Sequence, residues 1–402
     1  MAPYYTKAEN AIGSTHRGGR AALPANNNYK VFANGAKNVG YKFYATGPYG
    51  TNAEPYDGRP ASIQDGLNFQ GDKNGSKWST AKREIPRALE TGLLDLRTNA
   101  HVVKITHDKN GNVEDIVLGY ETIEGYLESN EIYFVALIGR YGNRIANGKF
   151  TLNDSTYTLA KNNGDNHLHG GKMGFNNVFW DALQISDYEL ELIYRSEDGE
   201  EGYPGKLDVV VVYKLTDNNE LEINYTANTS KATHINLTHH SFFNLHGAGK
   251  GSINDHLLQI NAEFYTPIKA GLIPTGDIEN VKGTPFDFIE PTLIGEHVND
   301  DDQQIKYGFG YDHNFVLDGF GLKLAATVIE PNSGRKMEVI TSEPGLQFYG
   351  GNFLDGKEFG KRNLPYNYRT AFCLEAQHFP DSPNQNHFPT TILNVDENYK
   401  SI

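Results

Sequence analysis

The sequence predicts an all-β protein built as an antiparallel β-sandwich. Its 24 tyrosines and 21 phenylalanines, with 42 glycines and only 3 methionines, favour strands joined by tight turns. From about residue 113 onward, short alternating runs are separated by turn-forming clusters at hairpin spacing. No sustained helical period of apolar residues crosses this region, so a helical architecture is not expected.

Three pairs of runs predict β-hairpins, because turn-forming residues separate the two runs of each pair. In chain order they are 150–152 with 157–159 around Asn153 and Asp154, 207–215 with 221–225, and 322–329 with 336–340. Each pair supplies two neighbouring antiparallel strands of the sandwich.

An irregular N-terminal extension containing a short helix is predicted before the sandwich. Residues 9–78 are rich in Gly, Asn, Pro and Tyr and show little apolar periodicity, which leaves ordered loops and partial disorder open. Ser79 and Thr80 are suited to cap a helix that runs to about Leu89, although Pro86 would shorten or kink it. A strand-like run at 101–106 follows.

Size and charge limit the classes of protein to which the chain can belong. The 402 residues suffice for one large β domain with an extra module, or for two to three ordinary domains. A net charge of −14 repels nucleic acid and anionic membranes, so a neutral small molecule is the expected ligand. There is no long apolar run and no secretory pattern at the start, which predicts a cytoplasmic protein. The single cysteine, Cys373, is expected to be a core residue.

Two of the four polar clusters contain arginines and histidines. Residues 139–145 include Arg140 and Arg144 beside glycines, where a guanidinium would bind sugar hydroxyls or form a structural ion pair. His167 and His169 are expected on the same side of an extended chain, with spacing that also suits a metal. A third metal ligand is not evident, so that interpretation is weak.

The other two clusters contain the candidate acid and base. His239 and His240 are adjacent in a strand-like run, so only one of them faces a given pocket. A hydrogen-bonded core histidine is the alternative. Glu375 lies inside an apolar strand, and a buried carboxylate requires hydrogen-bond donors, a raised pKa or a function. Together the four clusters indicate a sugar site.

From about Asn110 to the C-terminus the chain resembles the aldose 1-epimerases, also called galactose mutarotases. Nine blocks occur in the family's order: GNVEDIVLGY, LIGRYGNRIANGKFTL, NHLHGGKMGF, NLTHHSFFNL, YTPIKAGLIPTG, GTPFDF, GYDHNFVL, EPGLQFYGGNFLDG and LEAQHFPDSPN. The resemblance implies a β-sandwich of the supersandwich type over 110–402, with the sugar bound across one sheet.

The resemblance also implies roles for individual residues. Glu375 corresponds to the base that removes the proton from the O1 hydroxyl, and His240 to the acid that protonates the ring oxygen O5. The residues implied to bind sugar hydroxyls are Arg144, His169, Asp312 and Gln347, with Asn143 as a further neighbour.

The expected protein interconverts the α and β anomers of free aldohexoses such as galactose or glucose. The acid/base chemistry requires neither metal nor cofactor. The expected partner is a free monosaccharide, with no nucleic acid and no membrane, and the protein is expected to be a monomer or weak dimer. A non-catalytic carbohydrate-binding module with the same sandwich and pocket remains the alternative.

Residues 1–109 depart from that family. Residues 11–109 resemble an internal fragment of GMC-type flavin oxidoreductases, but no G-x-G-x-x-G motif follows a strand, so a working flavoenzyme is not expected. The mutarotase strands that normally precede the GNVEDIVLGY block are missing. The run 101–106 offers alternating faces and would substitute for one of them.

Overall fold

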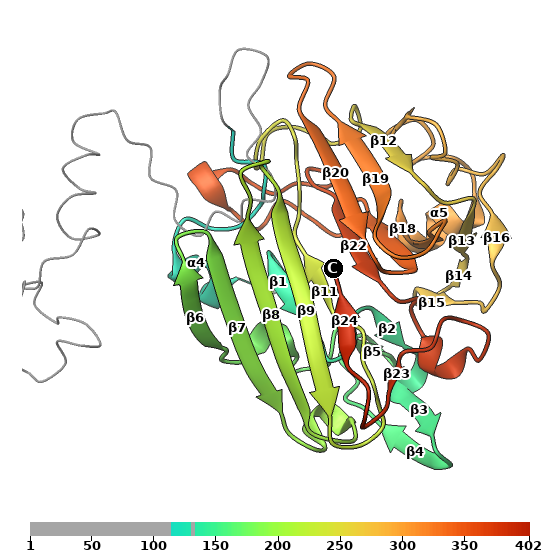
Figure 1. Ribbon diagram of the computed structural model, residues 1–402. Helices are drawn as coiled ribbons and strands as arrows, with labels where there is room; N and C mark the ends of the chain where they lie inside the picture. The colour runs from blue at the N-terminus through green and yellow to red at the C-terminus, as the bar shows by residue number, and fades with distance from the viewer. Residues whose placement is uncertain (1–113, 130–132) are drawn as a thin grey trace, which may run out of the picture. The chain divides into compact units, whose positions relative to one another are not determined.

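The computed structural model describes residues 114–129 and 133–402 (Figure 1). The predicted helix at 79–89, the predicted strand at 101–106 and the predicted domain boundary at 109/110 all lie outside these residues. In the described part, the pairings between named strands are all antiparallel. The predicted all-β, antiparallel architecture is confirmed.

Three larger sheets carry the fold. The first has the order β24-β9-β8-β7-β6 and is formed by β6 (Asp181–Ser186), β7 (Glu189–Ser196), β8 (Leu207–Leu215), β9 (Leu221–Thr229) and β24 (Tyr399–Ser401). The second has the order β16-β13-β18-β21-β22 and is formed by β13 (Phe264–Thr266), β16 (Glu279–Asn280), β18 (Asp312–Val316), β21 (Gly345–Tyr349) and β22 (Cys373–Gln377). The third has the order β17-β12-β19-β20 and is formed by β12 (Leu257–Ile260), β17 (Thr292–Leu293), β19 (Lys323–Ile329) and β20 (Lys336–Thr341).

Short strand pairs, two α-helices and five short 3-10 helices complete the described part. The pairs are β1 (Ala136–Ile138) with β11 (Thr238–His240), β2 (Arg144–Ile145) with β5 (His167–Leu168), β3 (Lys149–Leu152) with β4 (Ser155–Thr158), β10 (Thr233–His234) with β23 (Ile392–Leu393), and β14 (Ile268–Lys269) with β15 (Ile273–Pro274). Helix α4 (Ile123–Glu128) is capped by Thr122, whose side chain accepts a hydrogen bond from the Gly125 amide. Helix α5 (Gln303–Gly308) is capped by Asp302. Neither of these helices is long and apolar enough to cross a membrane.

The three predicted hairpins all form. In β3–β4, Asn153 and Asp154 adopt left-handed backbone angles with φ of 49° and 59°, as a two-residue hairpin turn requires. Strand β8 has the predicted bounds, and β9 extends four residues past its predicted end at Tyr225. In the third hairpin, β19 and β20 begin and end within one residue of the prediction. Local alternation and turn chemistry were therefore sufficient for these elements.

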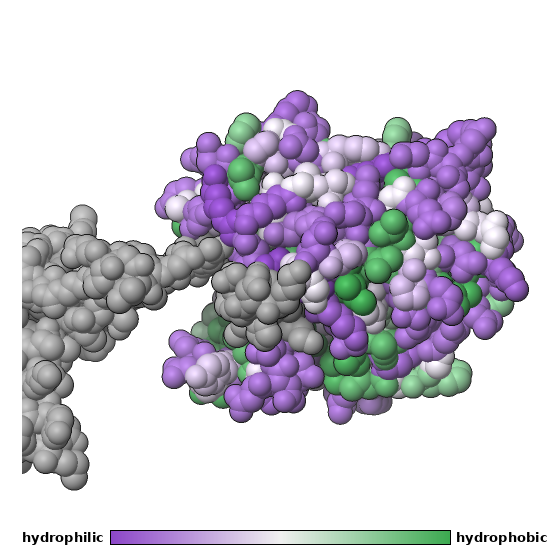
Figure 2. Space-filling view, turned by 90° about the horizontal axis from the view of Figure 1, so that it is seen from above, coloured by the Kyte–Doolittle hydropathy of each residue, from purple (hydrophilic) through white to green (hydrophobic). Residues whose placement is uncertain are grey.

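Alternation along the strands separates the core from the face that carries the polar clusters. The largest apolar cluster fills the space between the second and third sheets and contains Phe315, Phe348 and Leu374. Three polar residues lie an odd number of positions from these core residues on the same three strands: Asp312, Gln347 and Glu375. Because side chains alternate along a strand, these three point to the opposite face. Seen from above, the described surface is mostly hydrophilic, with hydrophobic side chains gathered in a few patches (Figure 2).

Candidate active site

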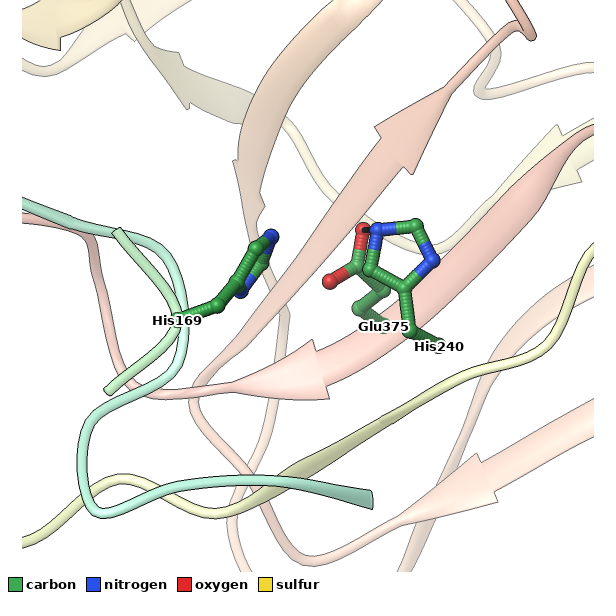
Figure 3. Close-up of side chains that lie close together, drawn as sticks. All are labelled: His169, His240 and Glu375. Atoms are coloured by element: carbon green, nitrogen blue, oxygen red, sulfur yellow. Dashed lines mark ion pairs between the residues drawn. The ribbon is translucent and has the colours of Figure 1, made fainter. Parts of the chain in front are cut away.

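The pairing of strands brings His240 and Glu375 together. Phe243 and Phe372 form an antiparallel bridge, with hydrogen bonds in both directions of 2.7 and 2.9 Å. His240 lies three residues before Phe243, and Glu375 lies three residues after Phe372. The two residues are therefore opposite each other in the antiparallel pairing. Opposed residues of antiparallel strands share a face. His240 Nε2 accordingly lies 3.6 Å from Glu375 Oε1 (Figure 3).

His169 faces this pair from the chain that follows β5. Its ring centroid lies 5.2 Å from that of His240, at an interplanar angle of 83°. The backbone amide of Asn143 donates to His169 Nδ1 at 3.2 Å, and the Asn143 side chain accepts from the Arg144 amide at 2.9 Å. Asn143 therefore orients its two neighbours through local hydrogen bonds.

Asp312, Gln347 and Arg144 form the other half of the cluster. Gln347 Nε2 donates to Asp312 Oδ1 at 2.6 Å, and Arg144 Nη1 lies 3.8 Å from Asp312 Oδ2. Gln347 also stands opposite Glu375 in the register of β21 and β22. All seven residues predicted at the site are thus linked by contacts or register, and their exposed fractions lie between 2% and 7%.

Burial shifts His240 and Glu375 toward their neutral forms. Desolvation raises the pKa of Glu375 well above its usual value; the charge of Asp312 adds to the rise, and that of Arg144 opposes it. Desolvation also lowers the pKa of His240 to about 4; its own backbone carbonyl opposes that fall and Arg144 adds to it. Both shifts favour the uncharged carboxylic acid and the uncharged imidazole over the charged pair.

Two buried oxygens at the site have no hydrogen-bond donor among the described residues, Glu375 Oε2 and Gln347 Oε1. Buried acceptors are nearly always paired in folded proteins, because an unpaired one costs roughly 1–3 kcal/mol. A ligand with several hydroxyl groups would satisfy them.

A metal fits this cluster less well. The ligand atoms of His169, His240 and Glu375 lie within 4.8 Å of one another. The Asn143 amide, however, donates to His169 Nδ1, so the proton of the neutral ring sits on Nε2. In that tautomer His169 is a donor toward a hydroxyl group and not a metal ligand.

One expectation for the histidines is wrong. His167 and His169 were expected on the same side of an extended chain, but His169 adopts φ of 50°, which turns the chain at that point. His167 instead lies in the interior, where its ring nitrogens bond Ala160 O at 2.7 Å and Tyr203 Oη at 2.8 Å. Its role is therefore structural.

Other residues behave as alternation and burial predict. His239 points away from His240 and contacts Ser241 Oγ at 2.9 Å and the ring of Tyr213. It lines a cavity of about 450 Å³ on the far side of β11 and β22, together with Leu374 and Ala376. The Arg140 guanidinium is buried against backbone carbonyls, including Gly205 O at 2.9 Å, and does not belong to the site.

Sequence reasoning missed three contributors to the site. The ring of Tyr133 stacks on His240 with a centroid distance of 5.6 Å and also contacts His169 at 4.8 Å. Asn163 Oδ1 accepts from Arg144 Nε at 3.2 Å. Cys373 Sγ lies 3.5 Å from His240 Nδ1. Its position two residues before Glu375 in one strand was the available signal.

Comparison with known proteins identifies the family of this chain. The family model "Aldose 1-epimerase" matches residues 100–402. Galactose mutarotase from Bos taurus is 47% identical over 293 residues, covering 73% of this chain and 83% of the relative. Aldose 1-epimerase from Escherichia coli K12 is 37% identical over 326 residues, covering 77% and 93%. The crystal structure of an aldose epimerase homologue from C. elegans matches with a TM-score of 0.67 at 27% identity, covering 73% and 88%.

The fold and these matches define a β-sandwich isomerase of the galactose mutarotase-like fold. The chain belongs to the aldose 1-epimerase family. It is an aldose 1-epimerase, also called a mutarotase, which is a type of isomerase. This decides against the non-catalytic carbohydrate-binding module. The family match begins at residue 100, so it includes residues 100–109, which the sequence interpretation had assigned to the N-terminal extension.

Proposed function

We propose that the protein interconverts the α and β anomers of a free aldohexose such as galactose or glucose, with Glu375 as general base and His240 as general acid. The observation that carries this assignment is the 3.6 Å approach of His240 Nε2 to a buried Glu375 carboxylate whose second oxygen lacks a donor among the described residues. The galactose mutarotases among its relatives support the choice of sugar.

The reaction starts with Glu375 as carboxylate and His240 as imidazolium. Glu375 takes the proton of the O1 hydroxyl, the C1=O1 double bond forms, the C1–O5 bond breaks, and O5 takes the proton from His240 Nε2. The sugar is then an open aldehyde. Rotation about C1–C2 presents the other face of the aldehyde, and return of both protons closes the ring to the other anomer. No proton is consumed.

The electrostatics of the site suit this cycle. After ring opening, Glu375 is a carboxylic acid and His240 is a neutral imidazole. Burial favours this protonation state, since it raises the pKa of Glu375 and lowers that of His240. The two protonation states differ only in the position of one proton, and each well-placed acid or base contributes about 10² to 10⁴ in rate.

The remaining site residues are assigned to the sugar hydroxyl groups. His169 Nε2 and the Arg144 guanidinium supply donors, while Asp312 and Gln347 Oε1 supply acceptors. Asn143 acts through its contacts with His169 and Arg144. Donors and acceptors that alternate around a small site match a hydroxyl-rich ring, because each hydroxyl both donates and accepts.

Polarimetry on freshly dissolved α-galactose and α-glucose tests this proposal directly. The protein should accelerate the change in optical rotation, and Glu375→Gln and His240→Asn should each remove nearly all of that acceleration. His239→Asn is the matched control, since this neighbouring histidine faces the other side of the sheet. Folded wild-type protein that leaves the rotation kinetics unchanged would refute the function. Full activity in Glu375→Gln or His240→Asn would refute that residue's role.

Further predictions concern the rest of the molecule. We keep the expectation of a cytoplasmic protein. We also keep the expectation of a monomer or weak dimer, which light scattering across a concentration series tests. The resemblance of residues 11–109 to a GMC-type fragment also stays a prediction, and the family match does not reach residues 11–99. Purified protein is expected to show no flavin absorbance.

A further inference from the structure

One strand contacts both ring nitrogens of the same imidazole. Cys373 and Glu375 are two residues apart in β22, so alternation directs both side chains to the same face. Glu375 Oε1 lies 3.6 Å from His240 Nε2, and Cys373 Sγ lies 3.5 Å from His240 Nδ1. Both residues are buried, with exposed fractions of 2% and 0%. His240 is thus held between two groups of one rigid element.

We propose that Cys373 is a positioning residue for the epimerase reaction, whose thiol sulfur accepts the Nδ1 proton of His240 and so leaves Nε2 as the nitrogen that exchanges a proton with the sugar. The inference rests on the proposed role of His240 as general acid. It gives the single cysteine of the chain a part in the chemistry that its burial alone does not require.

The tautomer follows from what lies next to each nitrogen. In the neutral ring only one nitrogen carries a proton. If that nitrogen were Nε2, ring closure would be blocked, because Nε2 could not take the proton from O5. The thiol sulfur is an acceptor that lies 3.5 Å from Nδ1, so a proton on Nδ1 gives this contact a hydrogen bond and leaves Nε2 without a proton.

A sulfur acceptor also differs from the carboxylate that commonly orients a catalytic histidine. A carboxylate beside Nδ1 would stabilise the imidazolium and raise its pKa. A thiol is a weak, uncharged acceptor, so it orients the ring while leaving the imidazolium free to give up its proton. The ring is further held by the stacked Tyr133, at 5.6 Å and 24°, and by Phe242 at 4.9 Å.

Kinetics of Cys373 variants test the role. Cys373→Val keeps a buried strand residue but removes the acceptor, and we expect kcat to fall by roughly ten-fold or more with KM within about two-fold of wild type. Cys373→Ser retains an acceptor and should keep kcat within a few-fold. Leu374→Val is the matched control, because this neighbour in β22 faces the far cavity, and its kcat should be unchanged.

Nitrogen chemical shifts of histidine-labelled full-length protein provide a readout that does not depend on activity. The neutral ring of His240 should show a protonated Nδ1 in wild type and in Cys373→Ser, and a mixture of tautomers in Cys373→Val. Among these variants, only Cys373→Val should shift the pH profile of kcat. The other titratable and charged groups around His240 are the same in all of them: His169, Glu375, Arg144, Tyr133 and Tyr349.

The outcomes separate the two proposals. Wild-type protein that shows no anomer exchange defeats the function, while the tautomer measurement still decides what Cys373 does. Wild-type kcat and an unchanged His240 spectrum in Cys373→Val would overturn the positioning role. If Cys373→Val fails to fold, the smaller Cys373→Ala serves instead. The positioning role would also be overturned if Cys373→Ser and Cys373→Val lost activity equally while their His240 nitrogen spectra matched that of wild type.

Discussion

Gln347 and Asp312 stand on neighbouring strands, and the amide of Gln347 donates a hydrogen bond of 2.6 Å to the Asp312 carboxylate. Burial raises the pKa of Asp312, whereas Arg144 and this hydrogen bond lower it. Gln347 therefore favours the ionised form of Asp312 and fixes its carboxylate in place. The side-chain carbonyl oxygen of Gln347, Oε1, has no hydrogen-bond donor among the described residues.

Gln347→Met should raise KM by roughly ten-fold or more, since a hydrogen bond to a charged group contributes about 1.5–3 kcal/mol. Methionine fills nearly the same volume, but Asp312 Oδ1 loses its donor at 2.6 Å, so the variant should also be destabilised by roughly 1.5–3 kcal/mol. Polarimetry over a range of galactose concentrations measures KM, and circular dichroism measures unfolding. An unchanged KM would show that neither Gln347 nor its hold on Asp312 contributes to sugar binding.

The two histidines of the 166–171 segment should respond in opposite ways to substitution. His169→Asn should lower kcat/KM by roughly ten-fold or more, because the shorter asparagine side chain does not place a donor where Nε2 of His169 lies, next to Glu375 and His240. His167→Asn should leave the activity of folded protein unchanged but destabilise it by about 1–3 kcal/mol, because the contacts with Ala160 and Tyr203 are lost in the interior. Activity and denaturant unfolding are measured on both variants. Loss of catalysis in His167→Asn at full stability would contradict this division.

Glu375→Gln should be more stable than wild type near neutral pH although it is inactive. The pKa of Glu375 is higher in the folded protein than in the unfolded chain. The wild type therefore loses stability as the pH rises from the unfolded pKa to the folded pKa. The amide carries no charge to desolvate, so the variant avoids this loss, worth about 1.4 kcal/mol for each unit of pKa difference. Thermal unfolding of both proteins at pH 4.5 and pH 8 tests this; the gain should appear mainly at pH 8. A less stable variant at pH 8 would contradict the assigned pKa shift.

The pH dependence of kcat/KM should show a plateau that extends well below the usual histidine range. The active pair carries one proton, and a second proton binds His240 only near its lowered pKa of about 4. Activity should fall again at high pH, where Glu375 has lost the shared proton. Polarimetric rates, corrected for spontaneous mutarotation at each pH, provide the profile. An acid limb centred near pH 6.5, the ordinary value for histidine, would contradict the arrangement.

Local sequence patterns predicted the strands well, because alternation and turn chemistry act over a few residues. The β3–β4 turn at Asn153 and Asp154 is an example, and so is the opposite orientation of His239 and His240. The roles of Glu375 and His240 came from the resemblance to a family, and the structure brings their side chains together.

Features that depend on long-range register or on single backbone angles could not be predicted. The left-handed turn at His169, which separates it from His167, has no glycine at that position to signal it. The stacking of Tyr133 on His240 joins segments about a hundred residues apart and depends on the pairing of β1 with β11, in which Ala136 lies opposite His240. Cys373 appeared to be an ordinary core residue, because burial predicts nothing about which nitrogen a thiol will touch.

The alternating geometry of β22 limits how this enzyme can change over time. Cys373 and Glu375 face His240, while Leu374 and Ala376 face the cavity behind the sheet. Inserting or deleting a single residue here would exchange the two sets at once and present aliphatic side chains to the substrate. Diversification within the family should therefore proceed through altered loops and point replacements, with the length of this strand left constant.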